Sequence, residues 1–269
     1  MMSVNDDLGK RMKENYEMRA RSYLTRRMPV AIRLDGAHFH TFTKGMKKPF
    51  DNVLITAMQN TMLRLCQNVQ GCVFGYTQSD EITLILIDYK NLNSEAWFDY
   101  QVQKICSTAA ALATLYFNQE FKKASRMEEL QYKTSLAPQD YKSCLAAEKR
   151  FAVLSAKTAM GATFDARCFN IPKEEVVNLV YWRQLDAIRN SIQMCGQARY
   201  SQKQLNGASC AVIKEMLRQD GFDWDAMLPY HQYGSACYYD EHEGWIIDKA
   251  MPVLKGVYRE YLERLINFD

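Results

Sequence analysis

Three carboxylates stand where apolar, strand-like runs begin or end, and their type and spacing indicate metal-dependent chemistry. Asp35 follows an apolar run at residues 30–32, and Asp80 and Glu81 separate two further apolar runs. An ionised carboxylate that is buried without a partner costs several kcal/mol, so these three imply a bound cation or a cationic partner. Oxygen ligands favour a hard ion such as Mg²⁺, which keeps open positions for phosphate oxygens.

Two such ions roughly 4 Å apart can hold the attacking and leaving oxygens of a phosphoryl transfer. We therefore predict a two-metal nucleotidyl-transfer site in which Asp35 bridges two Mg²⁺ ions, Asp80 is the second shared ligand and Glu81 assists. The carbonyl of Gly36 is a further candidate ligand, because glycine has no Cβ to block an approaching ion. The competing interpretations are an ordinary turn for Asp35 and simple solvent exposure for Glu81.

The elements that must position these residues can be predicted from periodicity and turn residues. They are a strand at 29–35, a helix capped by Asp51, strands at 72–77 and 82–88, a helix at 95–119, a strand at 163–169 and a helix at 173–195. This order resembles the split β-α-β plan, which brings Asp35 beside Asp80 although they are 45 residues apart. The predicted fold class is α+β, an antiparallel ferredoxin-like sheet covered by helices.

The whole chain, residues 1–269, is predicted to form a single catalytic unit. Its parts are an N-terminal helical segment at 1–28 (a helix at 3–26), a central α+β part at 29–170 and a C-terminal annex at 171–269. Within the central part, the charged residues at about 120–158 are weakly periodic and predict an excursion with one or two short helices. The annex is predicted to hold helices at 208–219 and near 252–265, with an antiparallel hairpin at 232–239 and 244–248.

Charge is distributed unevenly, although the net charge is only +3. Residues 1–219 contain 30 Lys or Arg against 21 Asp or Glu, whereas residues 220–269 contain 4 against 10. A basic body suits a polyanion held on part of the surface, and a solvated basic helix face is the simpler alternative.

Cysteine usage and hydropathy predict a cytoplasmic protein. The eight cysteines are scattered, without a CxxC pair, and most lie in apolar stretches, which is typical of reduced thiols rather than disulfides or a zinc site. No apolar run approaches the roughly 20 residues of a membrane span. The polar, acidic residues 1–7 do not resemble a secretory signal.

Several motifs together resemble the tRNA-His guanylyltransferase superfamily. Arg33-Leu34-Asp35-Gly36 with Phe39 and His40 is similar to its first motif, and Gln78-Ser79-Asp80-Glu81 is similar to its second. The similarity continues at Phe164-Asp165-Ala166-Arg167 and from Trp182-Arg183-Gln184 to Ser191. As an ordered set these motifs are specific, and they cover roughly residues 29–110 and 160–235.

The resemblance implies a polymerase-like palm that works in the reverse, 3′-5′ direction and adds nucleotides to the 5′ end of tRNA. A 5′ end activated as an adenylyl or triphosphate ester would be attacked by the 3′-hydroxyl of an incoming nucleotide. The implied cofactors are two Mg²⁺ ions with ATP or GTP as activating and incoming nucleotides. The implied assembly is a homo-oligomer, a tetramer formed as a dimer of dimers.

The resemblance also assigns binding roles, each with a simpler alternative. Implied nucleotide-binding residues are Arg33, His40, Lys48, Asp51, Ser79 and Lys104, and implied RNA-binding residues are Arg183, Arg189 and Asn190. The two lysines could instead be solvated, Asp51 could be only a helix cap, and Ser79 could be only a turn residue. Arg183, Asp186 and Asn190 share a helix face and could instead form a structural ion pair with a polar partner.

Two departures from the family pattern bear on which branch of the superfamily this sequence resembles. Enzymes specialised for histidine tRNA resemble one another in a His-Ile-Asn-Asn-Leu-Tyr-Asn run, whose histidine is replaced here by Ile188. This change resembles the guanylyltransferase-like branch, which is associated with template-dependent repair of 5′-truncated tRNAs. The second departure is Gln232, before Tyr233-Gly234, where basic residues are common in the family.

Four functions remain open from the sequence. The first is template-dependent 5′-end repair of tRNA, and the second is addition of a single G at position −1 of histidine tRNA. The third is a palm-type nucleotidyl cyclase, which would need neither the Trp182-Arg183-Gln184 helix nor a basic body. The fourth is a non-catalytic RNA-binding protein, which would have no use for the carboxylates.

Overall fold

A six-stranded sheet forms the centre of the molecule in the computed structural model, which describes residues 6–134 and 141–267. The strand order is β4-β1-β3-β2-β5-β6, and every neighbouring pair is antiparallel. The strands are β1 (Val30–Ala37), β2 (Cys72–Gln78), β3 (Glu81–Leu86), β4 (Thr163–Asn170), β5 (Ser235–Asp240) and β6 (Gly244–Asp248). The predicted α+β class with an antiparallel sheet is confirmed, and β1 lies directly beside β3, as the split plan requires.

Alternation along β1 decides which residues face which layer. Val30, Ile32 and Leu34 are buried on one face, whereas Ala31 packs into a separate apolar cluster on the other. Successive side chains of a strand point to opposite faces. Arg33 and Asp35 therefore share the face of Ala31.

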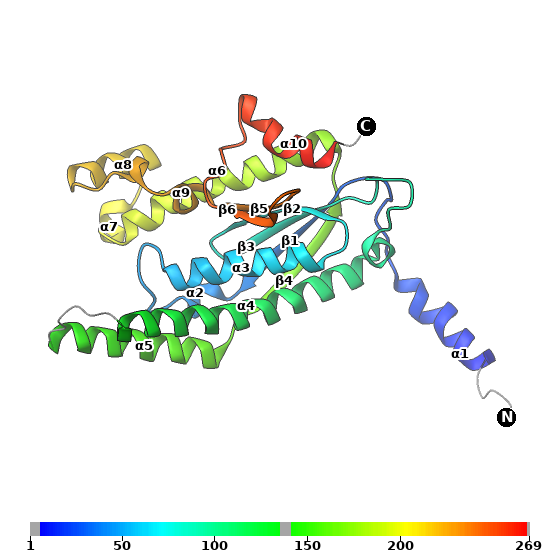
Figure 1. Ribbon diagram of the computed structural model, residues 1–269, viewed down its shortest axis with the longest axis horizontal. Coiled ribbons are helices and arrows are strands. Elements are labelled where there is room, and N and C mark those ends of the chain that lie inside the picture. The colour runs from blue at the N-terminus through cyan, green and yellow to red at the C-terminus, as the bar shows by residue number, and fades with distance from the viewer. Residues whose placement is uncertain (1–5, 135–140, 268–269) are drawn as a thin grey trace.

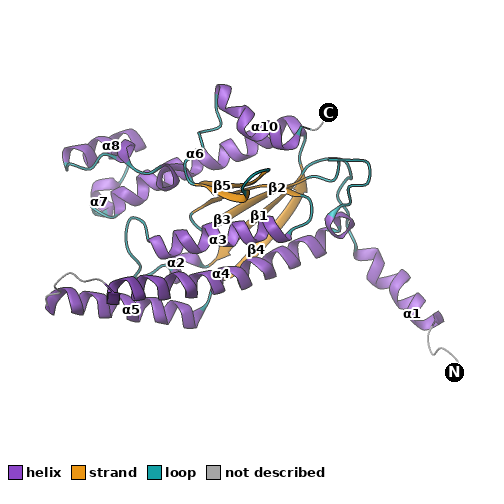
Figure 2. Cartoon of the chain, viewed as in Figure 1, coloured by secondary structure: helices purple, strands orange, loops and turns teal. Residues whose placement is uncertain are grey.

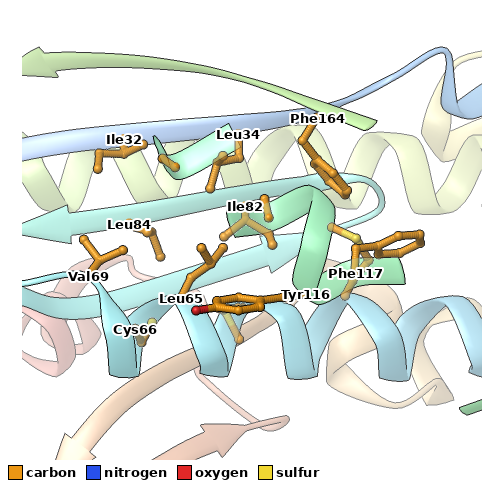
Figure 3. Packing of buried hydrophobic residues seen from close by; sticks show 14 of the residues in the cluster. Ile32, Leu34, Leu65, Cys66, Val69, Ile82, Leu84, Tyr116, Phe117 and Phe164 are labelled. Carbon is orange, nitrogen blue, oxygen red and sulfur yellow. The ribbon is translucent and has the colours of Figure 1, made fainter. Parts of the chain in front are cut away.

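Two long helices cover the face of Ile32. They are α3 (Asn52–Asn68) and α4 (Val102–Thr134), which lie side by side below the sheet in Figure 1. Figure 3 shows Leu65 and Cys66 of α3 and Phe117 of α4 against the apolar side chains of the strands. Asp51 caps α3 as predicted, because its carboxylate accepts a hydrogen bond from the backbone N–H of Val53 at 3.0 Å.

The opposite face is covered by α6 (Lys173–Gln197) and α10 (Glu260–Ile266), seen above the sheet in Figure 2. The apolar stripe of α6 includes Val176, Val177 and Val180, all fully buried in the cluster that also holds Phe74 and Tyr76. The predicted helix at 173–195 is thus confirmed. Its polar face, which begins at Arg183, lies over the end of the sheet that carries the carboxylates.

The segment at 120–158 differs from its prediction. Helix α4 starts at Val102 rather than near residue 95 and continues to Thr134, and α5 (Tyr141–Met160) follows as a second long helix. The two helices run alongside each other at the lower edge of the molecule (Figure 1). Charged side chains interrupt the apolar period here, because part of the contact between the helices is made by ion pairs such as Arg150–Glu128.

The two ends of the chain also differ from prediction. The N-terminal helix α1 (Asp6–Met12) gives way to a π turn and a 3-10 turn that ends at Ala20 instead of near residue 26. Met12 and Tyr16 are exposed, and α1 projects from the body in Figure 1. At the other end, α10 begins only at Glu260, after a short 3-10 turn, so the predicted start near residue 252 is wrong.

The annex contains three shorter helices, α7 (Gln202–Leu205), α8 (Cys210–Gln219) and α9 (Pro229–Tyr233). The hairpin β5–β6 follows α9 and is confirmed, although α9 occupies the first residues that were assigned to it. Among the described residues, none of the helices combines the length and apolar character needed to cross a membrane.

Candidate active site

Carboxylates converge at one end of the sheet because of strand register. Asp35 of β1 lies directly opposite Glu81 of β3 and, on its other side, opposite Asp165 of β4. The backbone N–H of Gly36 donates to the carbonyl of Asp80 at 3.1 Å, which places the β2–β3 turn against the end of β1. The structure therefore brings together Asp35, Gly36, Asp80 and Glu81, as the sequence predicted.

Asp35 and Asp80 carry charge that the protein does not compensate well. Burial raises the pKa of both carboxyls, and repulsion from neighbouring carboxylates, Glu81 foremost for Asp35 and Asp35 for Asp80, raises them further. Within residues 6–134 and 141–267, neither side chain forms an ion pair with Lys, Arg or His. Such a pair of half-buried carboxylates is a candidate cation site, because a bound cation would offset the effects that raise both pKa values.

Glu81 has the opposite environment, and its predicted role needs correction. Its side chain is buried, one oxygen accepts from Arg33 at 2.7 Å, and the other accepts from Arg183 at 2.7 Å. Both oxygens are thus engaged by guanidinium groups, so in this arrangement Glu81 is not available as a metal ligand. It is also not simply exposed, which excludes the competing interpretation.

The donor set fits Mg²⁺ with two protein carboxylates rather than three. In the described part of the chain, no three His, Cys, Asp or Glu side chains meet in a metal-holding group. Magnesium is commonly held by one or two carboxylates together with substrate phosphates and waters. Asp35 and Asp80, with the carbonyl of Gly36, match that requirement. A Cβ at residue 36 would lie 2.2 Å from the ring of Phe39, so packing also requires glycine there.

The turn that carries Asp80 is a two-residue connection between β2 and β3. Ser79 takes a φ of 51°, the left-handed region, and is exposed. The backbone N–H of Asp80 and, to a lesser extent, the neighbouring Ser79 hydroxyl lower the pKa of the Asp80 carboxyl and partly offset the effect of burial. Ser79 therefore supports Asp80, and its predicted phosphate contact stays a prediction.

The side chains on the predicted RNA-binding face of α6 bond largely to other residues of the protein. Arg183 is 6% exposed and donates to both Glu81 and Asp186, so it cannot also grip an RNA backbone, and this prediction is wrong. Asn190 donates to Asp186 at 3.3 Å, which is the structural pairing considered as the alternative. Arg189 also pairs with Asp186, but its side chain is 66% exposed and remains open to a polyanion.

A cavity of about 340 Å³ opens beside Asp80. It is lined by α2 (Phe39–Phe42), the segment from Met46 to Asp51, the β2–β3 turn, the middle of α6 and α9. Its walls are mainly apolar and aromatic, with a smaller number of polar groups that include Asp80. This combination is typical of small-molecule sites, and the volume suits a nucleoside.

Three of the predicted nucleotide-binding residues line this cavity with exposed side chains. His40, Lys48 and Ser79 are exposed at its wall, and Lys48 has no ion-pair partner among the residues that the structure describes. Asp51 also lines it, but the carboxylate is 2% exposed and is bound by Arg150, so direct contact with a nucleotide is not available. The helix-cap interpretation of Asp51 is the correct one.

Two predicted nucleotide contacts lie elsewhere. Arg33 faces Glu81 and the ring of Trp182, which its guanidinium carbon approaches to 5.3 Å from the centroid. Lys104 lies at the start of α4, 5.8 Å from the ring centroid of Phe98, and is not part of the cavity. The structure thus places Lys104 outside the cavity, although the resemblance implies that it binds the nucleotide.

Helix α9 supplies site residues that the sequence did not reveal. His231 stacks on Phe50 with ring centroids 4.7 Å apart and 6° between planes, and burial lowers its pKa, which favours the neutral imidazole. Gln232 donates to the backbone carbonyls of Trp224, Asp225 and Met227 and so holds the loop before α9 instead of contacting phosphate. Only the aromatic density of this segment could have indicated a stacking site.

Comparison with known proteins identifies the family. The family model for tRNA-His guanylyltransferase matches residues 9–172, more than half of the chain, and these residues include Asp35, Asp80 and Glu81. This chain belongs to the tRNA-His guanylyltransferase family.

Individual relatives and solved structures extend this comparison. An uncharacterized protein of Acanthamoeba polyphaga mimivirus is 29% identical over 200 residues, which cover 71% of this chain and 62% of that protein. The chain thus spans about three fifths of the length of that curated relative. A solved bacterial tRNA(His) guanylyltransferase-like protein in complex with ATP is 34% identical, with a TM-score of 0.80 over 97% of this chain and 100% of that one. A structure of such a protein with GTP gives 32% identity and a TM-score of 0.75 over 98% of this chain and 100% of that one.

Proposed function

We propose that this protein is a tRNA nucleotidyltransferase that extends the 5′ end of truncated tRNAs in the 3′-5′ direction under the guidance of a template. The observation that carries the proposal is the uncompensated pair Asp35 and Asp80 beside a nucleoside-sized cavity. Family membership supports the reaction class, and the ATP and GTP complexes of similar proteins support the nucleotides.

In the proposed reaction, the 3′-oxygen of an incoming nucleotide bonds to the activated 5′ phosphorus of the RNA, and AMP or pyrophosphate leaves. Asp35 and Asp80 would hold Mg²⁺, which supplies neutralisation of charge on the phosphate oxygens. Lys48 provides a compact positive charge at the cavity wall for a triphosphate. Phe50 and His231 offer a flat, stacked surface against which a base can lie.

The residue at position 188 favours repair over single G addition. Ile188 packs against the apolar cluster formed by α6, α8 and the loop that follows α8, together with Ile192 and Ile213. This position therefore offers no imidazole to the RNA, in contrast to the histidine in the run that marks enzymes specialised for histidine tRNA. A template-guided reaction requires no such contact, because base pairing with the opposite strand selects the nucleotide.

The decisive assay uses 5′-truncated tRNAs in which the base opposite the missing position is varied. Each RNA is incubated with Mg²⁺, ATP and one labelled nucleoside triphosphate at a time. We expect incorporation to follow the complement of the opposing base for all four bases. Addition of G alone, whatever the opposing base, would assign the protein to G−1 addition, and cyclic or dinucleotide products formed without RNA would assign it to the cyclases.

The assembly and location remain predictions. A tetramer formed as a dimer of dimers would place a second surface against the RNA. Sedimentation of the purified protein with and without tRNA measures the oligomeric state. A cytoplasmic location suits a reaction that uses tRNA and nucleoside triphosphates, and fractionation of cells measures it.

A further inference from the structure

The long helix α5 contacts the loop that forms one wall of the nucleotide cavity. Residues 46–51 of this loop line the cavity and include Lys48. Arg150 of α5 reaches it with two hydrogen bonds to the Asp51 carboxylate, at 2.6 and 2.9 Å. The same guanidinium donates twice to Glu128 of α4, at 2.9 and 3.0 Å.

Both carboxylates that bind Arg150 also contact the loop: Asp51 bonds its backbone, and Glu128 pairs with its Lys47 side chain. The second oxygen of Asp51 accepts from the backbone N–H of Lys47 at 2.9 Å, while the first caps α3 through Val53. The ammonium group of Lys47 also forms an ion pair with the Glu128 carboxylate, at 2.8 Å. The arrangement encloses the loop between the start of α3 and the α4–α5 pair.

Burial makes this group rigid. The Arg150 side chain is 11% exposed and that of Asp51 is 2% exposed, so neither can exchange its partner for water without cost. The pKa of Glu128 is lowered to about 2, chiefly by its hydrogen bonds with Arg150. A second contact lies about two turns further along α5, where Lys157 donates to the carbonyl of Thr41 in α2 at 3.1 Å.

We propose that Arg150 is a positioning residue, which holds the Lys47–Asp51 loop in the shape that presents Lys48 and Phe50 to the bound nucleoside triphosphate. The inference rests on the proposed function, because it concerns the nucleotide site of that reaction. On this proposal the helices α4 and α5 help to position the loop, because α5 supplies Arg150 and α4 supplies Glu128, which orients it. Arg150 acts through Asp51 and does not touch the nucleotide.

The test measures the equilibrium affinity for ATP and GTP without RNA, in the presence of Mg²⁺, for the wild-type chain and three variants. Arg150→Ala removes all four hydrogen bonds. Arg150→Lys keeps the charge but cannot form the paired bonds to Asp51. Glu128→Gln keeps Arg150 but weakens its orientation and the ion pair between Glu128 and Lys47. Lys149→Ala, at an exposed neighbouring position of α5, is the matched control.

We expect the dissociation constant to rise about tenfold or more in Arg150→Ala, because misplacing a positioning group by about 1 Å can cost up to about a hundredfold. Arg150→Lys should follow closely, Glu128→Gln should rise less, and the control should not change. In steady-state extension assays the KM for the nucleotide should rise by similar factors while kcat falls less. Melting temperatures are recorded in parallel, and Arg150→Lys and Glu128→Gln decide the matter if Arg150→Ala does not fold.

The outcomes separate this inference from the function on which it rests. Wild-type affinity with unchanged dissociation constants in Arg150→Lys and Glu128→Gln would overturn the positioning role and leave the proposed function intact. A lower melting temperature with unchanged affinity would mean that Arg150 only stabilises the fold, which also overturns it. A wild-type protein that binds neither ATP nor GTP would overturn both.

Discussion

Glu81 and the pair Asp35–Asp80 are neighbours at the same end of the sheet, yet they have opposite electrostatic environments. Glu81 is bound by Arg33 and Arg183, whereas Asp35 and Asp80 face other carboxylates and their pKa values are raised. The first group is complete within the chain. The second group has no ion pair with Lys, Arg or His among the described residues, and we propose that a divalent cation completes it. On this proposal, the bonding partners of a carboxylate, rather than its residue type or motif, distinguish a structural carboxylate from a metal ligand.

The other fully buried carboxylates follow the pattern of Glu81. Asp51 is bound by Arg150, and Asp88, which is 0% exposed, is bound by Arg26 at 2.6 Å. A buried charge without a partner is strongly destabilising, and each of these three buried carboxylates is bound by an arginine. The half-buried Asp35 and Asp80 have no such ion pair among the described residues, which supports their assignment as the proposed metal site.

The largest effect should come from removing the uncompensated pair. Asp35→Asn or Asp80→Asn should lower nucleotide incorporation at least about a thousandfold, roughly 4 kcal/mol, because the phosphate charge is then no longer neutralised. The fold should be retained, since both changes remove repulsion among carboxylates. Single-turnover extension of truncated tRNA gives the rate, and activity within tenfold of wild type in both variants would contradict the assignment.

Removing an arginine from the compensated group should affect stability instead. Arg183→Ala leaves a buried Glu81 with one partner, and we expect a loss of about 3 kcal/mol in the free energy of unfolding. Arg189→Ala is the control, because an exposed ion pair contributes at most about 1 kcal/mol. Urea denaturation measures both, and equal losses would mean that burial of Glu81 does not matter.

The pH dependence of Glu128 sharpens the same contrast. Its pKa is lowered from 4.5 to about 2, so its contribution is fully present above pH 4.5 and is lost as the pH falls toward 2. Glu128→Gln should therefore be less stable than wild type by on the order of 2 kcal/mol at pH 6, with a difference that shrinks between pH 5 and pH 3. A difference that is constant over this range would exclude ionisation of Glu128 as its cause.

The smallest predicted effects come from two lysines, Lys48 and Lys104, to which the resemblance assigns the same nucleotide-binding role. Lys48→Ala should weaken nucleoside triphosphate binding about tenfold, roughly 1.4 kcal/mol, because it removes a charge from the cavity wall. Lys104→Ala should change it less than about twofold, since Lys104 lies outside the cavity. Titration with a fluorescent nucleotide measures both, and a larger effect at Lys104 would place a phosphate beyond the cavity described above.

The sequence predicted the parts of the fold that depend on local pattern. The strands β1 to β4, the cap at Asp51 and helix α6 follow from alternation, helical spacing and turn residues that lie close together in the chain. The juxtaposition of Asp35 and Asp80 was also predictable. In the split β-α-β plan the end of the first strand lies beside the turn between the next two strands.

What could not be predicted depends on pairs that are distant in the sequence. Arg183 reaches Glu81 across 102 residues, and Arg150 reaches Asp51 across 99, with no local signal for either partner. The extent of α4 and α5 was missed because ion pairs such as Arg150–Glu128 replace apolar residues in part of the contact between these two helices. The Phe50–His231 stack was missed for the same reason, since only the folded chain brings the two rings together.

We propose that Asp35 and Asp80, and not Glu81, bind the divalent ions. Anomalous scattering from crystals soaked with Mn²⁺ and a nucleoside triphosphate measures this binding. We expect anomalous peaks within coordination distance of the Asp35 and Asp80 carboxylates, with Glu81 still bound to Arg33 and Arg183. Maps without peaks at saturating ligand, or a peak at a Glu81 that has left its arginines, would contradict it.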